Sequence, residues 1–364
     1  MDARAAVLLS EGAAPQLVNV EVREPVGSEA LIRVDAVGIC HTDVSVAARW
    51  PARKLPMVFG HEGVGTVVAT GSLARIDVGR QVVLTFASCG RCPSCVAAKP
   101  AYCDRSTTLN LRGDDADETS ALRLGGVPLR GGFFGQSSFA THVLAGPANT
   151  IALTEPLDPA LAAPLGCSVQ TGVGTVLGAT PVGTGDALVV FGAGAVGLSA
   201  VMGARIAGCG AIVAVDPKPE RRSLAMELGA TAVLDPGADD VTAHLPDLTG
   251  GGPTVAVDTT ALPAVIATAL VTLRACGTLA LVGLGALNAE LPVGLILAKG
   301  LRVRGVVEGD SDPQVFIPRL AELLRGGELP LEKLVTRFAF DDFGAAWTSA
   351  VTGSAIKPVV TMPR

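Results

Sequence analysis

Four cysteines lie within fifteen residues of this 364-residue sequence, at Cys89, Cys92, Cys95 and Cys103. The spacing lets four thiolates converge tetrahedrally on one Zn²⁺ with no open position, which is the form of a structural zinc site. A redox dithiol would need only two of these cysteines. A zinc ribbon on nucleic acid is disfavoured by the formal net charge of −6. The sequence therefore predicts a structural zinc in this cysteine lobe.

A glycine-rich segment runs from Leu188 to Gly197, where an apolar strand leads through a GxGxxG turn into a predicted helix. The first glycine of such a turn permits a tight bend, the second lets the backbone approach a pyrophosphate, and the third lets helix and strand pack closely. The helix N-terminus also offers unpaired N–H groups to phosphates. The alternative is a buried turn that binds nothing. The flanking strand and helix favour a dinucleotide site formed by Gly192, Gly194, Val196 and Gly197.

The next predicted strand ends in Asp216, nineteen residues beyond Gly197. A carboxylate at this position can accept hydrogen bonds from both ribose hydroxyls and would repel a 2′-phosphate, so NAD is favoured over NADP. Arg221 and Arg222 lie nearby in the sequence and weaken that preference.

A second set of metal-ligating side chains is spread along the chain. Cys40 follows a predicted strand in GICHTD, His61 opens GHEGVG, and Cys167 lies in PLGCSVQTG. Spacing alone does not connect residues so far apart, and each by itself is more often part of a core. All three stand beside small or polar residues at strand ends, where an open cleft could form.

The elements that would position these residues fall into two parts. Residues 1 to about 150 contain short alternating runs between Gly and Pro turns, which predict strands at 29–37, 65–70 and 79–86, and an acidic stretch at 113–123 that predicts a surface loop. After about residue 168 predicted strands alternate with helices, which indicates a parallel sheet. These strands are expected at 187–191, 211–215, 232–234, 254–258 and 277–282, with helices ending at 209 and spanning 219–228 and 263–274. The tail predicts a helix at 314–325 and a strand at 357–362, and we expect it to return to the first part.

The composition suits a two-domain α/β protein. Apolar residues make up 49% of the chain, and 44 glycines and 24 prolines indicate close helix–strand packing and many turns. The chain has no basic block, and its first residues do not form a signal peptide. The most apolar stretch, 187–215, is interrupted by glycines and Arg205, which favours a buried strand–helix–strand over a membrane span. We therefore expect a soluble cytoplasmic protein with reduced cysteines, bound neither to nucleic acid nor to a membrane.

The motifs GICHTD, PMVFGHEGVGTV, CGRCPSC, LGCSVQTGVG and VVFGAGAVG occur in the order seen in the medium-chain, zinc-dependent alcohol dehydrogenases, which the sequence resembles over essentially its whole length. The resemblance implies a GroES-like, β-rich catalytic domain at 1–168 and 306–364. It implies a Rossmann domain at 169–305, with a doubly wound parallel sheet that binds NAD.

The resemblance also implies roles for single residues. It implies that a catalytic zinc, with water or alcohol in its fourth position, is bound by Cys40, His61 and Cys167. Asp43 would orient His61, as metal-bound imidazoles usually require. Glu62 would lie behind the zinc, and Lys357 would reach the cofactor pyrophosphate.

The reaction implied by the resemblance is oxidation of an alcohol by hydride transfer to NAD. Zinc would act as a Lewis acid that lowers the pKa of the alcohol, and Thr42 would take the hydroxyl proton. Many relatives carry a histidine five residues after the first zinc cysteine, at the end of a proton relay, but here that position is Ser45. We therefore expect the proton to leave through Thr42, the ribose hydroxyls and water.

The substrate is indicated only by local resemblance. The segment FFGQSSFA at 133–140, the acidic stretch before it and GDSDP at 309–313 are similar to the aryl- and allyl-alcohol branch, which contains benzyl alcohol and geraniol dehydrogenases. Trp50 and, more weakly, Phe86 are candidates for an aromatic pocket wall that would favour flat apolar substrates. The alternative is that Trp50 and the pair Phe133–Phe134 only close the core.

Two other functions stay open. A thiol-dependent formaldehyde dehydrogenase would need a larger, cationic pocket, and a non-catalytic protein could bind NAD and zinc without turnover. The expected partner is a small-molecule alcohol or aldehyde. The family commonly pairs subunits through the edge of the cofactor-domain sheet, and the apolar segment Leu291–Leu301 is predicted to form that edge in a homodimer or homotetramer.

Overall fold

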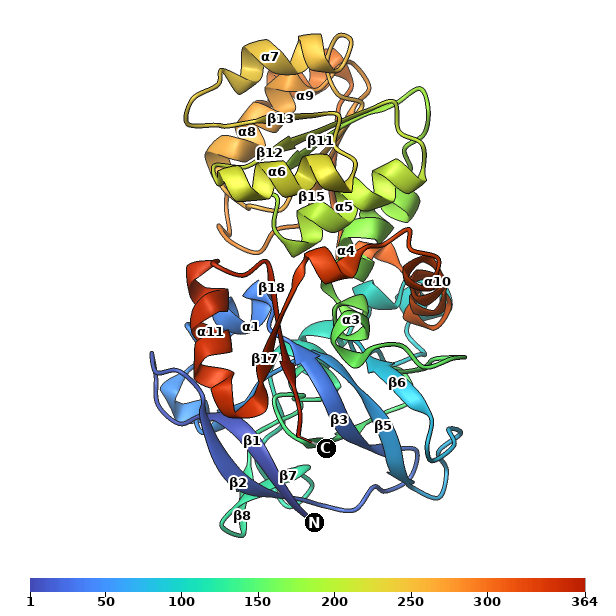
Figure 1. The fold of residues 1–364 in the computed structure, drawn as a ribbon, viewed down its shortest axis with the longest axis vertical. Helices are drawn as coiled ribbons and strands as arrows, with labels where there is room; N and C mark the ends of the chain where they lie inside the picture. Colours follow the sequence, from blue (N-terminus) through green and yellow to red (C-terminus); the bar gives the residue numbers. More distant parts are fainter. Residues whose placement is uncertain (364) are drawn as a thin grey trace. The chain divides into compact units, whose positions relative to one another are not determined.

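The computed structural model describes residues 1–363, which form two compact units (Figure 1). Unit 1 comprises Met1–Cys167, Asp312–Gly327 and the chain from Leu334 onward. Unit 2 comprises Ser168–Ser311 and Glu328–Lys333. The division after residue 167 lies next to the predicted boundary at 168. The tail returns to unit 1 at residue 312 rather than 306, and a short piece at 328–333 belongs to unit 2.

Unit 2 is built on a six-stranded parallel sheet with the order β13-β12-β11-β14-β15-β16. The strands are β11 (Ala187–Phe191), β12 (Ala211–Val215), β13 (Ala232–Leu234), β14 (Val255–Asp258), β15 (Thr278–Leu281) and β16 (Arg302–Gly305). β11 is buried along its whole length, as expected of an apolar run in a parallel sheet covered on both faces. This is the strand order of a Rossmann fold, with the reversal of order between β11 and β14.

Helices cover both faces of this sheet. In Figure 1 α5 and α6 lie on one side of the strands, and α7, α8 and α9 lie on the other. The bounds are α4 (Ser168–Gly174), α5 (Ala195–Ile206), α6 (Pro219–Leu228), α7 (Val241–Leu248), α8 (Pro263–Thr272) and α9 (Val293–Lys299). α6 begins with Pro219 at its first position and ends at Gly229 in the left-handed region, the punctuation that predicted it from the sequence.

The prediction that Leu291–Leu301 forms the sheet edge is wrong. Most of this segment is the helix α9, and the edge strand is β16, which follows it. A short apolar run does not by itself separate helix from strand. The local signals are Pro292 at the helix N-cap and Gly300, whose φ of 60° ends the helix in the left-handed conformation.

Unit 1 contains two sheets. In the seven-stranded sheet the order is β10-β6-β5-β3-β18-β17, and β9 also pairs with β3. Its strands are β3 (Ala30–Gly38), β5 (Glu62–Thr70), β6 (Gln81–Leu84), β9 (His142–Ala145), β10 (Thr150–Ala152), β17 (Val335–Ala339) and β18 (Lys357–Thr361). The five-stranded sheet has the order β4-β1-β2-β7-β8. Its strands are β1 (Asp2–Leu8), β2 (Gln16–Val22), β4 (Met57–Val58), β7 (Leu122–Leu124) and β8 (Val127–Leu129).

Apolar side chains from both sheets and from the tail form one core in unit 1. Its helices are α1 (His41–Ala47), α2 (Pro93–Val96), α3 (Pro159–Ala162), α10 (Pro313–Arg325) and α11 (Phe343–Thr352). β17 and α11 were not predicted from the sequence, and β18 lies between β17 and β3. In residues 1–363 no single helix is long and apolar enough to cross a membrane. Two helical segments joined at a bend, Pro159–Gly166 and Ser168–Ala179, meet the length and composition criteria only when they are taken together.

Candidate active site

The sheet register in unit 1 brings the first two predicted zinc ligands to one place. Gly38, the last residue of β3, pairs with Glu62, the first residue of β5. Cys40 and His61 flank this pair in the sequence, so both side chains lie at the same end of the two strands. Cys167 reaches them from the end of a short 3-10 turn, Ala163–Gly166, which packs against β6.

The side chains of Cys40, His61, Glu62 and Cys167 form a buried cluster in which one ligand atom from each lies within 4.8 Å of all the others. His61 Nε2 is buried and has no hydrogen-bond partner among the described residues. Such a buried nitrogen without a partner is costly unless something binds it, and a zinc ion would satisfy it together with the two cysteine sulfurs. The donor set therefore fits the predicted zinc site.

Asp43 determines which nitrogen of His61 faces this cluster. One carboxylate oxygen lies 2.9 Å from His61 Nδ1 and accepts from the Gly60 N–H at 3.1 Å, and the other accepts from the Cys40 N–H at 3.0 Å. Asp43 itself is fully buried. The arrangement leaves Nε2 for the metal, as the predicted orienting role of Asp43 requires.

The pKa values in the cluster favour anionic sulfur. The contact with Cys167 and the positive charge of Lys357 hold the pKa of the Cys40 thiol well below its ordinary value, in spite of burial. Burial lowers the pKa of His61, but the charge and the hydrogen bond of Asp43 raise it well above its ordinary value. A metal ion at this position would replace the proton on Nε2.

Lys357 does not have the predicted environment of a pyrophosphate ligand. It is buried, and its Nζ donates to both carboxylate oxygens of Glu62 at 2.9 Å. Burial lowers the pKa of Lys357, but the charge of Glu62 raises it above its ordinary value, whereas burial raises the pKa of Glu62. An isolated charge at this depth would be unstable, so the two residues compensate each other beside the zinc ligands.

The two residues of the predicted proton path lie on α1. The Thr42 hydroxyl is 3.7 Å from Cys40 Sγ, at the border of the ligand cluster. Ser45 is half-buried one turn further along the helix, where its carbonyl accepts a hydrogen bond from Arg49.

Trp50 and Phe86, the candidates for the pocket wall, are both buried in the apolar core. The ring of Trp50 meets Phe59 edge-on at 5.2 Å, and its indole N–H donates to the Lys54 carbonyl. A pocket role for these two residues stays a prediction.

One contact at the site was not foreseen. The ring of Phe134 stacks on the imidazole of His61, with centroids 4.4 Å apart and an interplanar angle of 26°. The sequence signal was the FFG segment, which we interpreted only as a substrate wall or as core.

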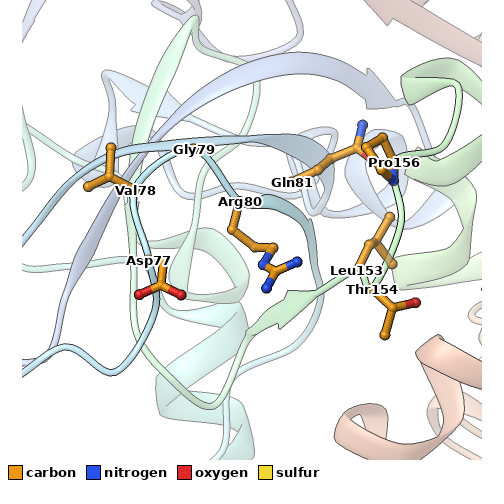
Figure 2. Close-up of a pocket in the computed structure, with 8 residues that line it drawn as sticks. All are labelled: Asp77, Val78, Gly79, Arg80, Gln81, Leu153, Thr154 and Pro156. Carbon is orange, nitrogen blue, oxygen red and sulfur yellow. The ribbon is translucent and has the colours of Figure 1, made fainter.

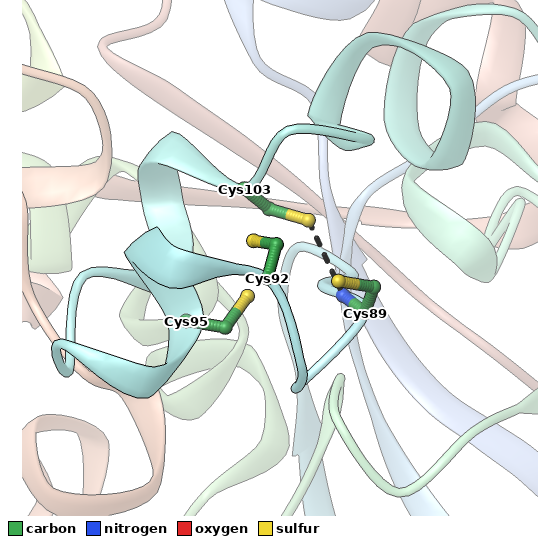
Figure 3. A group of neighbouring side chains, drawn as sticks. All are labelled: Cys89, Cys92, Cys95 and Cys103. Atoms are coloured by element: carbon green, nitrogen blue, oxygen red, sulfur yellow. Dashed lines mark hydrogen bonds between the residues drawn. The ribbon is translucent and has the colours of Figure 1, made fainter.

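The predicted structural zinc site is the cysteine lobe, Cys89, Cys92, Cys95 and Cys103 (Figure 3). The four sulfurs lie within 4.8 Å of one another. Backbone N–H groups point at them: Cys89 and Arg105 donate to the sulfur of Cys103, and Asp104 donates to that of Cys92. Backbone hydrogen bonds from Arg91 and Cys92 lower the pKa of Cys89 to about 6, whereas burial raises the pKa of Cys95 to about 11. A loop that stabilises thiolates in this way fits Zn²⁺.

The dinucleotide site of unit 2 lies between β11 and α5. Gly192 has a φ of 92°, and a Cβ on Gly197 would collide with the Gly192 carbonyl. By contrast, a Cβ on Gly194 would meet nothing within 4 Å. The second glycine of the motif thus borders open space, where the backbone can approach a pyrophosphate. Val196 is half-buried in the first turn of α5.

Asp216 directly follows β12 and lies beside this turn. Its carboxylate accepts hydrogen bonds from the backbone N–H groups of Ala193 and Lys218 at 2.8 and 2.9 Å. Arg222 donates to the Asp216 carbonyl and pairs with Asp235 at 3.0 Å, whereas Arg221 lies 3.9 Å from the Asp216 carboxylate. Each arginine is therefore already in contact with an acidic residue.

A surface pocket of about 340 Å³ in unit 1 is not a candidate for the active site (Figure 2). It lies at the start of β6 and is lined by Asp77–Gln81, Leu153, Thr154 and Pro156. The lining offers neither a thiol nor an imidazole, so it lacks the ligands found in the cluster.

Comparison with known proteins identifies this combination of parts. Residues 27–154 match the alcohol dehydrogenase GroES-like domain, and residues 195–324 match the zinc-binding dehydrogenase family. The chain belongs to the zinc-dependent, medium-chain alcohol dehydrogenases. It is 42% identical to the geraniol dehydrogenase of Castellaniella defragrans, over 99% of this chain and 98% of that enzyme.

Solved structures agree with this assignment. Benzyl alcohol dehydrogenase from Acinetobacter calcoaceticus has a TM-score of 0.95 at 37% identity, with both chains fully covered. A protein from Sinorhizobium meliloti, described as a zinc-binding dehydrogenase and bound to NADP, has a TM-score of 0.81 at 26% identity over 99% of each chain. The predicted GroES-like and Rossmann folds and the predicted enzyme family are thus confirmed.

Proposed function

We propose that the protein oxidises a primary alcohol to an aldehyde, reversibly, with NAD as hydride acceptor, and that its preferred alcohols are aromatic or allylic. The observation that carries this proposal is the buried set of Cys40, Cys167 and the unpartnered Nε2 of His61. Zinc bound there would polarise the alcohol oxygen and lower the pKa of its hydroxyl.

The chain's own residues have separate tasks in this reaction. Thr42 would accept the hydroxyl proton at the border of the ligand cluster, and because Ser45 stands where many relatives carry a relay histidine, the proton would leave without the help of an imidazole. Asp43 holds His61 in the tautomer that leaves Nε2 free. Lys357 neutralises Glu62, so that the buried carboxylate does not add a negative charge beside the two thiolates.

The aromatic or allylic preference is supported by two observations. Relatives with 42% and 37% identity are named for geraniol and benzyl alcohol. Phe134 also places an aromatic ring at the ligand cluster, stacked on His61 with centroids 4.4 Å apart. Flat apolar substrates gain most from such rings through burial and edge contacts.

NAD is proposed over NADP because Asp216 would repel a 2′-phosphate. Arg222 is directed to Asp235, and Arg221 lies next to the Asp216 carboxylate, so neither arginine offers a phosphate an unopposed charge. We also propose two zinc ions per chain, one in the ligand cluster and one in the cysteine lobe. No disulfide joins any of the eight cysteines, all of which lie in the described residues, and this suits the reducing cytoplasm that we propose as the location.

We further propose that the protein forms a homodimer or homotetramer through β16. This strand is the edge of its sheet and is largely exposed. Leu287 and Leu297, from the neighbouring loop and helix, are 91% and 82% exposed. An open strand edge with exposed apolar side chains is a typical pairing surface. Sedimentation of the purified protein tests this: a monomer at micromolar concentration would contradict it.

The decisive experiment is formation of NADH by the purified protein with benzyl alcohol, geraniol or ethanol. Each reaction is run with and without a strong zinc chelator, and a Cys167→Ser variant is the matched control. We expect chelator-sensitive turnover that prefers the first two alcohols and is lost in the variant. Preference for ethanol would contradict the substrate proposal only. No turnover with any alcohol, despite bound zinc, would favour the thiol-adduct enzyme or the non-catalytic protein.

A further inference from the structure

Phe134 has a backbone conformation that a phenylalanine rarely adopts. Its φ of 52° and ψ of 30° lie in the left-handed region, where a non-glycine residue is strained. Such strain persists only where surrounding contacts impose it, and it is common at functional sites.

The surrounding contacts are two buried amide side chains. Asn149 donates from Nδ2 to the carbonyls of Phe134 and Gly135 at 3.1 and 3.0 Å. Gln136 donates from Nε2 to the carbonyls of His61 and Thr85 at 3.0 and 2.9 Å. Asn149 thus fixes the backbone of the loop at Phe134, and the loop in turn holds the backbone of His61 through Gln136.

The ring of Phe134 contacts the imidazole of His61 and restrains the orientation of its plane. The hydrogen bond to Asp43 restrains the Nδ1 edge, but an imidazole held at one edge can still tilt about that bond. Phe134 covers one face of the imidazole at 4.4 Å and is nearly parallel to it, whereas Phe133 meets it edge-on at an angle of 78°. Phe134 therefore opposes tilting of the imidazole towards its own side.

We infer that Phe134 is a positioning residue for the metal centre: its ring, held by the strained loop, fixes the plane of His61 and so the direction of Nε2. This goes beyond a pocket wall, because the face of the ring turned to the imidazole is not available to a substrate. The inference rests on the proposed zinc at Cys40, His61 and Cys167.

The test removes the ring without disturbing the backbone. Phe134→Gly suits this purpose, because glycine adopts the left-handed region without strain. Phe134→Tyr retains the stacked ring. Phe133→Leu is the control for packing, since that ring is fully buried but touches His61 only edge-on.

Two readouts report on the metal rather than on turnover. The first is the rate at which each zinc is released to a chelator, with the cysteine lobe as internal reference. The second is the visible absorption of the cobalt(II)-substituted protein, which reports ligand geometry. We expect Phe134→Gly to release the zinc of the ligand cluster about 10-fold faster or more, in line with the 10–100-fold effects of removing supporting groups, and to alter the cobalt spectrum. Phe134→Tyr should stay within about twofold of the parent protein.

Either of two results would overturn the inference: Phe134→Gly folds and matches the parent in both readouts, or Phe133→Leu changes both as strongly. A parent protein that holds a single metal, in the cysteine lobe, would instead refute the proposed catalytic zinc. The two failures are therefore distinguishable.

Discussion

The ion pair between Lys357 and Glu62 allows a quantitative test of the site's architecture. Both side chains are essentially inaccessible, and the ammonium lies 2.9 Å from both carboxylate oxygens. Replacing Lys357 by Met keeps the length of the side chain and leaves Glu62 buried without its partner. Because breaking one side of a buried pair exposes the full desolvation cost of the other, we expect the free energy of unfolding to fall by about 3–5 kcal/mol.

The double variant Glu62→Met/Lys357→Met separates this cost from simple loss of packing. With both charges removed, the apolar replacements should restore the free energy of unfolding to within about 1 kcal/mol of the parent protein. Arg337→Met is the matched control, because its ion pair with Asp158 is about half exposed. The free energy of unfolding of that variant should fall by less than about 1 kcal/mol.

Urea unfolding followed by tryptophan fluorescence is the appropriate assay. Both tryptophans, Trp50 and Trp347, lie in unit 1, so the signal reports on the unit that contains the pair. If Lys357→Met lowers the free energy of unfolding by no more than Arg337→Met does, the assigned buried ion pair is wrong. A double variant that is no more stable than the less stable single variant would refute the explanation by charge compensation.

The loss of stability in Lys357→Met should also depend on pH. Burial raises the pKa of Glu62, and removal of Lys357 removes the charge that opposes this rise. A carboxyl whose folded-state pKa is raised binds its proton more tightly when folded, so its contribution to stability is lost as pH rises through that pKa. The defect of Lys357→Met should therefore be larger at pH 8.5 than at pH 6.5, measured with zinc in excess. A defect independent of pH would contradict this reasoning.

Three further predictions concern the other sites. Asp43→Asn should weaken zinc binding in the ligand cluster by about 10–100-fold, measured by competition with a chelator, whereas the same change at the exposed Asp341 should have no effect. Gly194→Ala should weaken cofactor binding in a calorimetric titration while leaving the melting temperature unchanged. Gly197→Ala should lower the melting temperature, because its Cβ would collide with the backbone. Equal effects of the two variants would refute the separate roles of the two glycines. The affinity of the cysteine lobe for zinc should fall as pH is lowered, because protons compete with the metal for the thiolates, and the fall should become steeper below about 6, where Cys89 also takes up a proton; an affinity that does not change between pH 8 and pH 5 would contradict this reasoning.

The cofactor unit was predicted closely because its signals are local. β11, β12 and β13 have the predicted bounds, since each is an apolar run that ends at a turn residue. The apolar segment before β16 was predicted wrongly because its local signals are ambiguous. A seven-residue apolar helix such as α9 has the same hydropathy as a buried strand, and only its terminal proline and glycine distinguish it.

The site was only partly predictable, because its contacts join distant parts of the sequence. The cysteine lobe could be inferred from spacing, whereas the cluster of Cys40, His61 and Cys167 needed the family resemblance. The partner of Lys357 is 295 residues away, so the sequence offered no sign that the ammonium faces Glu62. The stacking of Phe134 on His61 depends on a left-handed backbone held by Asn149, which no local pattern indicates.

The position of β18 has a consequence for how the chain folds as it is synthesised. This strand is added between β3 and β17, and it carries Lys357 to a carboxylate made near the start of translation. Until β18 emerges from the ribosome, the edge of β3 at residues 36–38 is unpaired and the charge of Lys357 is missing beside Glu62. Nearly all of unit 2 leaves the ribosome before that point, and its sheet needs no strand from the tail. The nascent chain therefore completes its cofactor unit first and closes its metal unit last.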